Sequence, residues 1–381
     1  MRVGARVLRA LPAIGFGLVL ALALDQAIRL FLPHATNENR HWYLQTVQYH
    51  PVLGWSGYPN FAGTKDGNPI QTNSLGYRDR EPADTADGGK LGVLFVGDSF
   101  TWGDEVRQEE RFSSLLEASC GSLCDRLPPV RSINHGLIGY GTAQSLLDYM
   151  LARGGRPYEA VILALYTGND LTDNTTVDSP SGPRPRLIHC DQEKSYEGLC
   201  LEGVPVPAVV DWPEHRLIND RGGVARAFRW SGLISMARER RAPGFLIDRR
   251  IAGQMANVSG ALPFPIVTRT SDAPVPDRVG QLESILRAFN RTVHEGGKAF
   301  GVMVFPSARV YSGDPEGELR EYGQILDVLS RLDIPFADFY AATKGSRLED
   351  LYSGDQGHWR ASGHQEAAKL LRPLLVTLAS R

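Results

Sequence analysis

A serine stands where a buried strand of a parallel sheet is expected to end. The short run 92–97 is apolar, which predicts a buried strand, and Asp98 and Ser99 follow it directly. Open α/β sheets bind their ligands at the carboxyl ends of the strands. A hydroxyl at that edge is a candidate nucleophile, provided that the chain also supplies a base and donors for an oxyanion.

An imidazole and a carboxylate near the other end of the sequence could activate that serine. Asp355 and His358 lie three residues apart in a loop before a helical pattern. An imidazole can take the proton of a serine hydroxyl, and a carboxylate then holds the imidazole tautomer and stabilises the imidazolium. His364 is the alternative base, but it lies inside the start of the final helix, where packing or local hydrogen bonding is more common. We therefore prefer His358.

Two further strand ends carry candidate oxyanion donors. A glycine-rich stretch follows the strand expected at 130–134, and Asn169 follows the strand expected at 160–166. A glycine backbone N–H and an asparagine amide are suitable donors for a developing oxyanion. The candidates are the Asn169 amide and the N–H of one of three glycines, Gly136, Gly139 and Gly141.

Each of these residues also has an ordinary structural interpretation. Asp98 and Ser99 could cap the helix that follows them, and Asn169 with Asp170 could form a turn. For His135, beside the glycine-rich stretch, we favour a structural role over substrate contact. Four such blocks in one chain, each at a predicted strand end or before a helix, favour the chemical interpretation.

The four blocks, taken in order, resemble the SGNH (GDSL-type) hydrolase family. They are Gly97-Asp98-Ser99-Phe100, Ile138-Gly139-Tyr140, Gly168-Asn169-Asp170 and Asp355-Gln356-Gly357-His358. Phe100 stands where many members have leucine. The resemblance implies that Ser99 is the nucleophile, His358 the general base and Asp355 the acid that orients it. It also implies an oxyanion hole formed by the N–H groups of Ser99 and Gly139 and the side-chain amide of Asn169.

The rest of the sequence predicts the elements that position these blocks. Strands are expected at 92–97, 130–134, 160–166, 298–305 and 334–338, and helices at 111–119, 142–153, 278–295, 318–331 and 361–380. Such alternation predicts a parallel sheet with helices on both faces. We therefore expect an α/β fold, a three-layer α/β/α sandwich with a five-stranded parallel sheet, which is the flavodoxin-like SGNH hydrolase fold.

Three segments surround this predicted hydrolase domain, which spans 91–381. Residues 34–90 form a lead-in segment that packs on the core, and its Leu75-Gly76-Tyr77-Arg78 occurs in similar form in exported members of the family. An insertion occupies 171–277. Its part 179–210 is Pro-rich and loop-like, and its part 222–251 is Arg-rich and amphipathic. The second part is either a solvated helical cap or a lid that binds an anionic polymer or a membrane surface.

The first 33 residues predict export. Arg2, Arg6 and Arg9 precede an uncharged stretch from Ala10 to Leu24, and apolar character resumes through Leu32. Positive residues before an apolar segment place the N-terminus in the cytoplasm. We favour an uncleaved membrane anchor, with the catalytic domain on the periplasmic side of the inner membrane, over a cleaved signal peptide or a buried amphipathic helix.

The cysteines agree with an oxidising compartment. Cys120 and Cys124 lie four residues apart, and Cys190 and Cys200 ten apart. Two local pairs predict two small disulfide-closed loops, and free buried cysteines are the alternative.

Composition narrows the function further. The net charge of −2 and the absence of a basic motif predict no nucleic-acid partner, and scattered histidines without a Cys-x-x-Cys pair give little support for a metal. The resemblance implies no cofactor. We expect a serine esterase that acts on O-acyl esters, in particular acetyl esters, of a cell-envelope carbohydrate. The alternatives are an O-acyltransferase with the same Ser-His-Asp machinery, a lipid esterase, or a carbohydrate-binding protein without activity; the sequence does not indicate an oligomeric state.

Overall fold

The computed structural model describes most of the predicted hydrolase domain. The described residues are 17, 20, 21, 23, 24, 46–65, 67–82, 89–120, 127–152, 157–179, 182–193, 195–206, 262–267, 275, 277–313, 317–354 and 357–381. The chain divides into two compact units, residues 1–49 with 208–247 and residues 50–207 with 248–381. Most of the first unit, with nearly all of the predicted anchor and the Arg-rich part of the insertion, lies outside the described residues. Within the part of the chain that is described, no helix combines the length and the apolarity that a membrane crossing requires.

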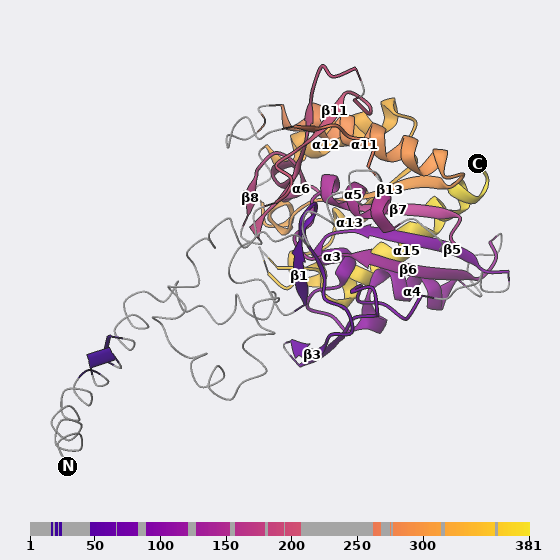
Figure 1. Cartoon of the computed structure of the whole chain (residues 1–381). Helices are drawn as coiled ribbons and strands as arrows, with labels where there is room; N and C mark the ends of the chain where they lie inside the picture. Colours follow the sequence, from indigo (N-terminus) through magenta and orange to yellow (C-terminus); the bar gives the residue numbers. More distant parts are fainter. Residues whose placement is uncertain are drawn as a thin grey trace, which may run out of the picture. The chain divides into compact units, whose positions relative to one another are not determined.

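A five-stranded parallel sheet forms the centre of the second unit (Figure 1). Its order is β6-β5-β7-β13-β14, with every neighbouring pair parallel. The strands are β5 (Leu91–Gly97), β6 (Val130–Gly136), β7 (Ala160–Tyr166), β13 (Ala299–Phe305) and β14 (Phe336–Asp338). The predicted parallel sheet is confirmed, and its flavodoxin-like order puts β5, the strand that leads to Ser99, between β6 and β7.

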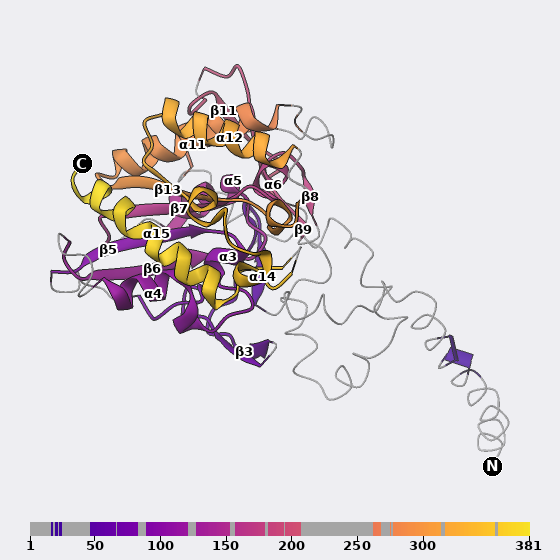
Figure 2. The same ribbon diagram turned by 180° about the vertical axis from the view of Figure 1, so that it is seen from behind.

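Helices cover both faces of this sheet (Figures 1 and 2). On one face lie α4 (Phe112–Ser119) and α15 (Ala361–Ala379), and on the other α5 (Thr142–Ala152), α11 (Arg278–Glu295) and α12 (Glu318–Arg331). In α11 the buried residues Leu282, Ile285, Leu286 and Phe289 recur at helical spacing, which gives the apolar stripe that packs on a sheet. The predicted three-layer sandwich is therefore confirmed.

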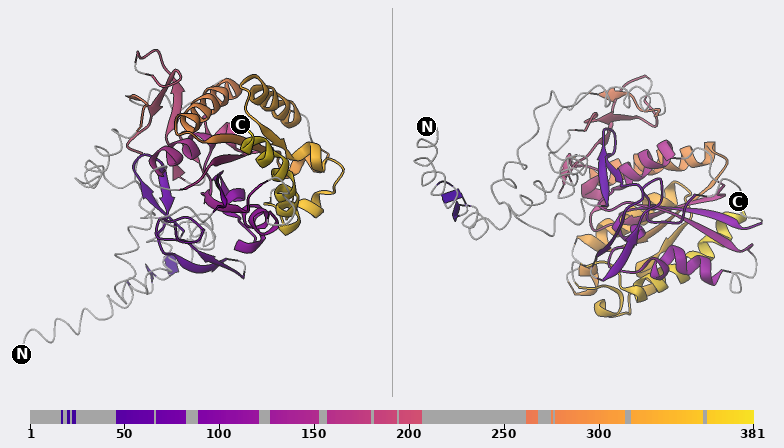
Figure 3. Two further views of the ribbon diagram at one scale, coloured as in Figure 1. Left: turned by 90° about the vertical axis from the view of Figure 1, so that its right-hand side faces the viewer. Right: turned by 60° about the horizontal axis from the view of Figure 1, so that its bottom comes forward.

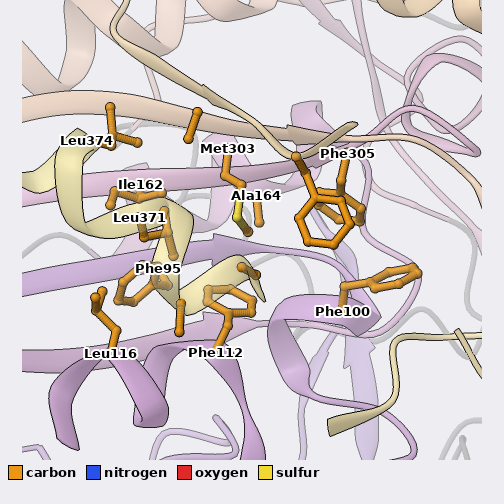
Figure 4. Packing of buried hydrophobic residues seen from close by; sticks show 14 of the residues in the cluster. Phe95, Phe100, Phe112, Leu116, Ile162, Ala164, Met303, Phe305, Leu371 and Leu374 are labelled. Carbon is orange, nitrogen blue, oxygen red and sulfur yellow. The ribbon is translucent and has the colours of Figure 1, made fainter. Parts of the chain in front are cut away.

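The layer between the sheet and α4 with α15 is apolar and rich in aromatic rings (Figure 4). Phe95, Ile162 and Met303 from three neighbouring strands meet Leu116 of α4 and Leu371 of α15, all fully buried. Such close packing of apolar side chains is the main favourable contribution to folding. The expected bounds of the five long helices differ from the observed ones by one residue at most. Among the described helices, those missed by the expectation are short: α3 (Ser99–Trp102), η2 (Gln108–Glu110), α6 (Asp170–Asp173), η5 (Ala308–Tyr311), α13 (Phe339–Thr343) and α14 (Leu348–Leu351).

The described part of the lead-in segment forms the short strands β1 (Val47–His50), β2 (Gly54–Gly57), β3 (Ala62–Lys65) and β4 (Asn68–Gln71). Of these, β2, β3 and β4 belong to the second unit and lie beside its sheet (Figure 3). The strands β3 and β4 pair antiparallel, with Lys65 opposite Asn68 next to the turn. This hairpin places two polar side chains at its tip.

The described part of the insertion corrects one expectation. The region 179–210 is not simply a loop, because β10 (Arg186–His189) and β11 (Leu199–Glu202) pair antiparallel and β12 (Ile266–Val267) adds in parallel to β11. The signal was the buried apolar set Leu187, Leu199 and Leu201, which the surrounding prolines and glycines obscured. A further two-residue pair, β8 (Asp178–Ser179) with β9 (Gly182–Pro183), precedes them.

A disulfide closes the β10–β11 hairpin. Cys190 and Cys200 are joined, with Cα atoms 5.8 Å apart, in the pairing expected from the sequence. Cys120 is also disulfide-bonded, and its expected partner Cys124 lies outside the described residues. Among the described cysteines none is free.

Candidate active site

Ser99 begins the short helix α3 at the carboxyl end of β5. The Asp98 side chain caps this helix, because its Oδ1 accepts a hydrogen bond from the Phe100 N–H at 2.9 Å. Gly97 is required by close packing, since a Cβ there would lie 2.4 Å from Thr101 Oγ1 and 2.8 Å from the Ala164 carbonyl oxygen. The sequence at the strand end thus turns the chain sharply and leaves the Ser99 side chain at the sheet edge.

His358 reaches Ser99 from the loop between α14 and α15. Its Nε2 lies 2.7 Å from Ser99 Oγ, a normal hydrogen-bond distance. Ser99 is 8% exposed and the His358 side chain 25% exposed, so the pair is sheltered but open to a substrate on one side. The structure therefore brings together the two residues that the sequence predicts as nucleophile and base.

The other imidazole nitrogen of His358 faces two carboxylates that the sequence analysis missed. Nδ1 lies 3.4 Å from Glu105 Oε1 and 3.7 Å from Asp104 Oδ2. Asp355, the predicted acid, lies outside the described residues. Nothing in the spacing of Asp104 and Glu105 marks them, although both follow the nucleophile helix directly and so stay near Ser99.

Electrostatics favour the protonated imidazole. Burial lowers the pKa of His358, but the hydrogen bond with Glu105 and the charges of Asp104 and Asp98 more than offset this, so the pKa stands above its usual value. The same hydrogen bond is the largest cause that lowers the pKa of Glu105 to about 2. A base whose cation is stabilised in this way suits a proton shuttle between a hydroxyl and a leaving alcohol.

The two predicted oxyanion donors lie at the ends of the strands that flank β5. Gly139 has φ +73°, a left-handed value that favours glycine, in a turn closed by the hydrogen bond from Tyr140 N–H to the Leu137 carbonyl at 3.1 Å. The Leu137 N–H in turn donates to the Gly97 carbonyl at 3.0 Å, which ties this turn to the nucleophile strand. Asn169 is half-buried at the N-cap position of α6, and its side chain makes no capping hydrogen bond there.

The alternative glycines have packing roles. A Cβ at Gly136 would lie 2.2 Å from the Trp102 backbone nitrogen, and one at Gly141 would lie 2.9 Å from the Asp173 Cβ. Gly139 alone among the three combines a left-handed φ with partial exposure. Gly139 therefore stays the predicted donor among the three.

The lead-in segment contacts both sides of this site. The Trp55 indole N–H donates to the Ile138 carbonyl at 3.0 Å, and the Tyr140 hydroxyl donates to the Trp55 carbonyl at 2.6 Å, so Trp55 brackets the Gly139 turn. The buried Arg78 guanidinium donates to the carbonyls of Gly103 at 2.5 Å and Val106 at 2.8 Å, just after the nucleophile helix. These contacts add to the hydrogen bond from Leu137 to β5 in positioning the loops around the site.

Two other histidines are structural. His364 is fully buried against Phe112, whose N–H donates to His364 Nδ1 at 3.3 Å, and burial lowers its pKa to about 3. His135 is buried and stacks on Tyr77 with ring centroids 3.7 Å apart. Both agree with the structural roles favoured by the sequence.

Two buried aspartates lie under the site. Burial raises the pKa of Asp98 to about 7 and that of Asp170 well above its usual value. Each is also raised by negative charge nearby, Asp98 by Asp173 and Asp170 by Asp98. Perturbed carboxyl groups of this kind gather at functional sites. Within the described residues, no group of three or more His, Cys, Asp or Glu side chains is arranged to hold a metal ion.

This chain resembles known proteins in its structure but not in its overall sequence. No family model matches the sequence, and no curated protein shows a significant match. The structure is similar to a lipolytic protein of the G-D-S-L family from Veillonella parvula DSM 2008, at 10% identity over 76% of this chain and 100% of that chain, with a TM-score of 0.39. It is also similar to an acetyl xylan esterase from Geobacillus stearothermophilus, at 13% identity over 75% and 95% of the two chains, with a TM-score of 0.39.

A third similar structure is the psychrotrophic esterase EstA from Pseudoalteromonas sp. It shares 11% identity over 77% of this chain and 100% of that chain, with a TM-score of 0.38. Because all three likenesses are weak, the chemical interpretation rests on the geometry of Ser99 and His358.

Proposed function

We propose that this chain is a serine ester hydrolase that works through an acyl-enzyme. The observation that carries the proposal is the 2.7 Å contact between Ser99 Oγ and His358 Nε2 at the carboxyl edge of a parallel sheet. Ser99 attacks the ester carbonyl while His358 takes the hydroxyl proton and then gives it to the leaving alcohol. Water next attacks the acyl group with His358 as base, which releases the acid and restores Ser99.

The remaining predicted site residues complete this mechanism. The N–H groups of Ser99 and Gly139 and the Asn169 amide bind the tetrahedral anion, and Asp355 orients His358. Removal of one oxyanion donor costs about 10²–10³ in kcat, so Asn169→Ala should lose that much turnover while its folding is unchanged. Wild-type turnover in Asn169→Ala would contradict this assignment of the hole.

The natural substrate proposed here is an O-acyl, especially O-acetyl, ester of a cell-envelope carbohydrate. The export predicted from residues 1–33 and the resemblance to SGNH hydrolases support it. We would measure acetate release from an O-acetylated polysaccharide beside fatty-acid release from phospholipid vesicles. Release of fatty acid alone would replace the carbohydrate with a lipid ester.

The proposed location is the periplasmic side of the inner membrane, with 1–33 as an uncleaved anchor. The Cys190–Cys200 disulfide supports an extracytoplasmic site, because disulfides persist in oxidising compartments. Protease added to spheroplasts should digest the catalytic part of the full chain. In a separate fractionation without protease, the full chain should stay with the membranes. A released product that lacks the first residues would instead indicate a cleaved signal and a secreted protein.

The experiment that tests the function uses the full chain in mild detergent without reducing agent. Hydrolysis of p-nitrophenyl acetate and labelling by a fluorophosphonate are compared for wild type, Ser99→Ala and His358→Ala. The matched control is Ser114→Ala, on α4. We expect both activities to be lost in the first two variants and kept in the control.

The other outcomes discriminate between the alternatives. Labelling of Ser99 without hydrolysis, together with transfer of the acetyl group to an added sugar, would indicate the O-acyltransferase. Absence of labelling in the wild type would overturn the serine mechanism and favour a binding protein.

A further inference from the structure

Glu105 lies beside the imidazole nitrogen that faces away from the nucleophile. His358 Nδ1 is 3.4 Å from Glu105 Oε1, while Nε2 is 2.7 Å from Ser99 Oγ. When an imidazole accepts a proton at one nitrogen, a carboxylate at the other holds the tautomer and stabilises the cation. We propose that Glu105 is a second positioning acid for His358, besides Asp355, and that the lead-in hairpin holds it in place. This inference rests on the proposed hydrolase function.

The backbone of Glu105 has an unfavourable conformation for its residue type. Its φ is +67°, in the left-handed region that non-glycine residues rarely adopt. A strained residue persists only where the surrounding structure holds it, and such residues gather at functional sites. Here the Asn68 side-chain amide donates to the Glu105 carbonyl at 3.1 Å, and the Glu105 N–H donates to Asp104 Oδ1 at 3.1 Å.

The tip of the β3–β4 hairpin supplies this support. Lys65 Nζ lies 2.5 Å from Asp104 Oδ1, with side chains 15% and 6% exposed. Lys65 and Asn68 are a cross-strand pair, so one hairpin tip contacts both Asp104 and Glu105. A shift of this tip would move the two carboxylates together relative to His358.

Among the described residues, Asp98, Asp104 and Glu105 raise the pKa of His358, and His364 is a further titratable group nearby, whose own pKa His358 lowers. Asp98 lies before α3, Asp104 and Glu105 follow it, and His364 comes from α15. Of these, Glu105 makes the hydrogen bond to the imidazole, and its carboxyl remains ionised because its pKa is lowered to about 2. The charge of the Lys65 ammonium, like His358, lowers the pKa of Glu105.

An NMR titration of ¹³C-labelled histidines in the full chain tests the contact without requiring turnover. The His358 signal is identified by its loss in His358→Gln. Replacement of an ionised partner by a neutral one lowers the pKa of a histidine, so in Glu105→Gln the midpoint should move to lower pH by about one pH unit. The control Glu109→Gln removes the same charge from an exposed side chain that contacts Arg107, and it should leave the midpoint in place.

Lys65→Met should move the midpoint in the same direction as Glu105→Gln, but by less. Without the Lys65–Asp104 contact the hairpin tip no longer holds Asp104 and Glu105 beside Nδ1, so the imidazolium loses support and the His358 signal should titrate at lower pH than in the wild type. Equal midpoints in Glu105→Gln and Glu109→Gln would overturn the proposal. This result stands apart from the proposed function, because failure of the wild type to hydrolyse esters or react with fluorophosphonate leaves the titration readable.

The pH profile of kcat/KM gives the catalytic readout. In Glu105→Gln the plateau should fall roughly tenfold, the change that one pKa unit represents, and the acid limb should move to lower pH. A merely structural loss would lower the whole profile without moving the limb. Glu105→Gly provides a second variant, because it removes the carboxylate and relieves the left-handed strain; it should show the same altered profile with thermal stability no lower than that of the wild type.

Discussion

The apolar layer under α15 and the polar lead-in segment support the same sheet edge by different means. The layer packs Phe95, Phe305 and Leu371 with no hydrogen-bond requirement (Figure 4). The lead-in segment acts through Trp55 and Arg78, whose side chains donate to carbonyls of the Gly139 turn and of the loop after α3. We call Trp55, Lys65, Asn68, Tyr77 and Arg78 the clamp.

The difference separates what stabilises the fold from what places the site. Hydrophobic burial is non-directional and scales with area, so the layer holds the sheet and helices together without specifying a loop conformation. Hydrogen bonds have narrow distances and angles, so the clamp can position the nucleophile loop and the oxyanion turn. Changes in the layer should therefore lower stability alone, whereas changes in the clamp should lower stability and turnover together.

The largest effect is expected at Arg78, the most buried charge of the clamp. Arg78→Met leaves the carbonyls of Gly103 and Val106 without their donors, and each unsatisfied buried group is costly, so the free energy of unfolding should fall by about 4 kcal/mol. Urea unfolding followed by circular dichroism measures this. The matched control is Arg80→Met, whose half-exposed ion pair with Glu117 is worth roughly 0.5 kcal/mol. Equal stability of the two variants would show that the clamp does not work through Arg78.

Leu371→Ala tests the apolar layer. Loss of a fully buried leucine from α15 should cost about 3 kcal/mol, since a cavity remains. Esterase activity of the folded fraction should stay at the wild-type value. Leu370→Ala, at a partly buried position of the same helix, should cost less. A fall in kcat at low temperature, where Leu371→Ala is folded, would mean that the layer also positions the site.

Trp55→Phe tests the clamp at the oxyanion turn. It removes the donor to the Ile138 carbonyl and should cost about 1–2 kcal/mol of stability, with slower fluorophosphonate labelling because the Gly139 N–H loses its support. Tyr322→Phe is the matched change elsewhere, since it removes a buried hydroxyl that donates to the Val304 carbonyl at 3.0 Å. We expect similar stability losses in the two variants, with slower labelling only in Trp55→Phe. Unchanged labelling in both would contradict a role of Trp55 in placing the oxyanion turn.

The smallest effect is a pH dependence from His364, a titratable group inside the apolar layer. Burial lowers its pKa to about 3 from 6.5, so the unfolded state binds a proton that the folded state does not, and stability falls as pH falls below 6.5. At one pH unit below that value the loss is roughly 1.4 kcal/mol. Between about pH 7.5 and pH 5.5, the unfolding free energy of His364→Gln should depend less on pH than that of the wild type. Parallel curves for the two proteins would show that His364 is not the group responsible.

The apolar periodicity of the sequence predicted the sheet and its layers, but it did not predict the polar contacts. The runs at 92–97 and 160–166 and the stripe of α11 fall within a residue of their observed elements because burial imposes a regular spacing. The β10–β11 hairpin was missed because its strands are short and prolines surround it. Lys65 and Asn68 contact residues almost forty positions away, and no sequence spacing encodes such a contact.

The site likewise contains residues that the sequence predicted and residues that it did not. Ser99 and His358 were predictable because each stands in a block with a known order, and the structure places them in contact. Glu105 was not, because an acid in a turn usually indicates only solvation, and its left-handed backbone is visible only in the structure. Whether Asp355 shares His358 with Glu105 stays a prediction.

The two residues in contact at the site are 259 positions apart in the chain. During synthesis the amino-terminal part of a protein emerges first, so the nucleophile strand is made long before its base exists. If His358 is the base that activates Ser99, as proposed, a nascent or truncated chain that stops before residue 358 should not react with esters. Under the proposed function, ester cleavage would therefore begin only after translation has passed residue 358 and the loop before α15 has folded against the sheet edge.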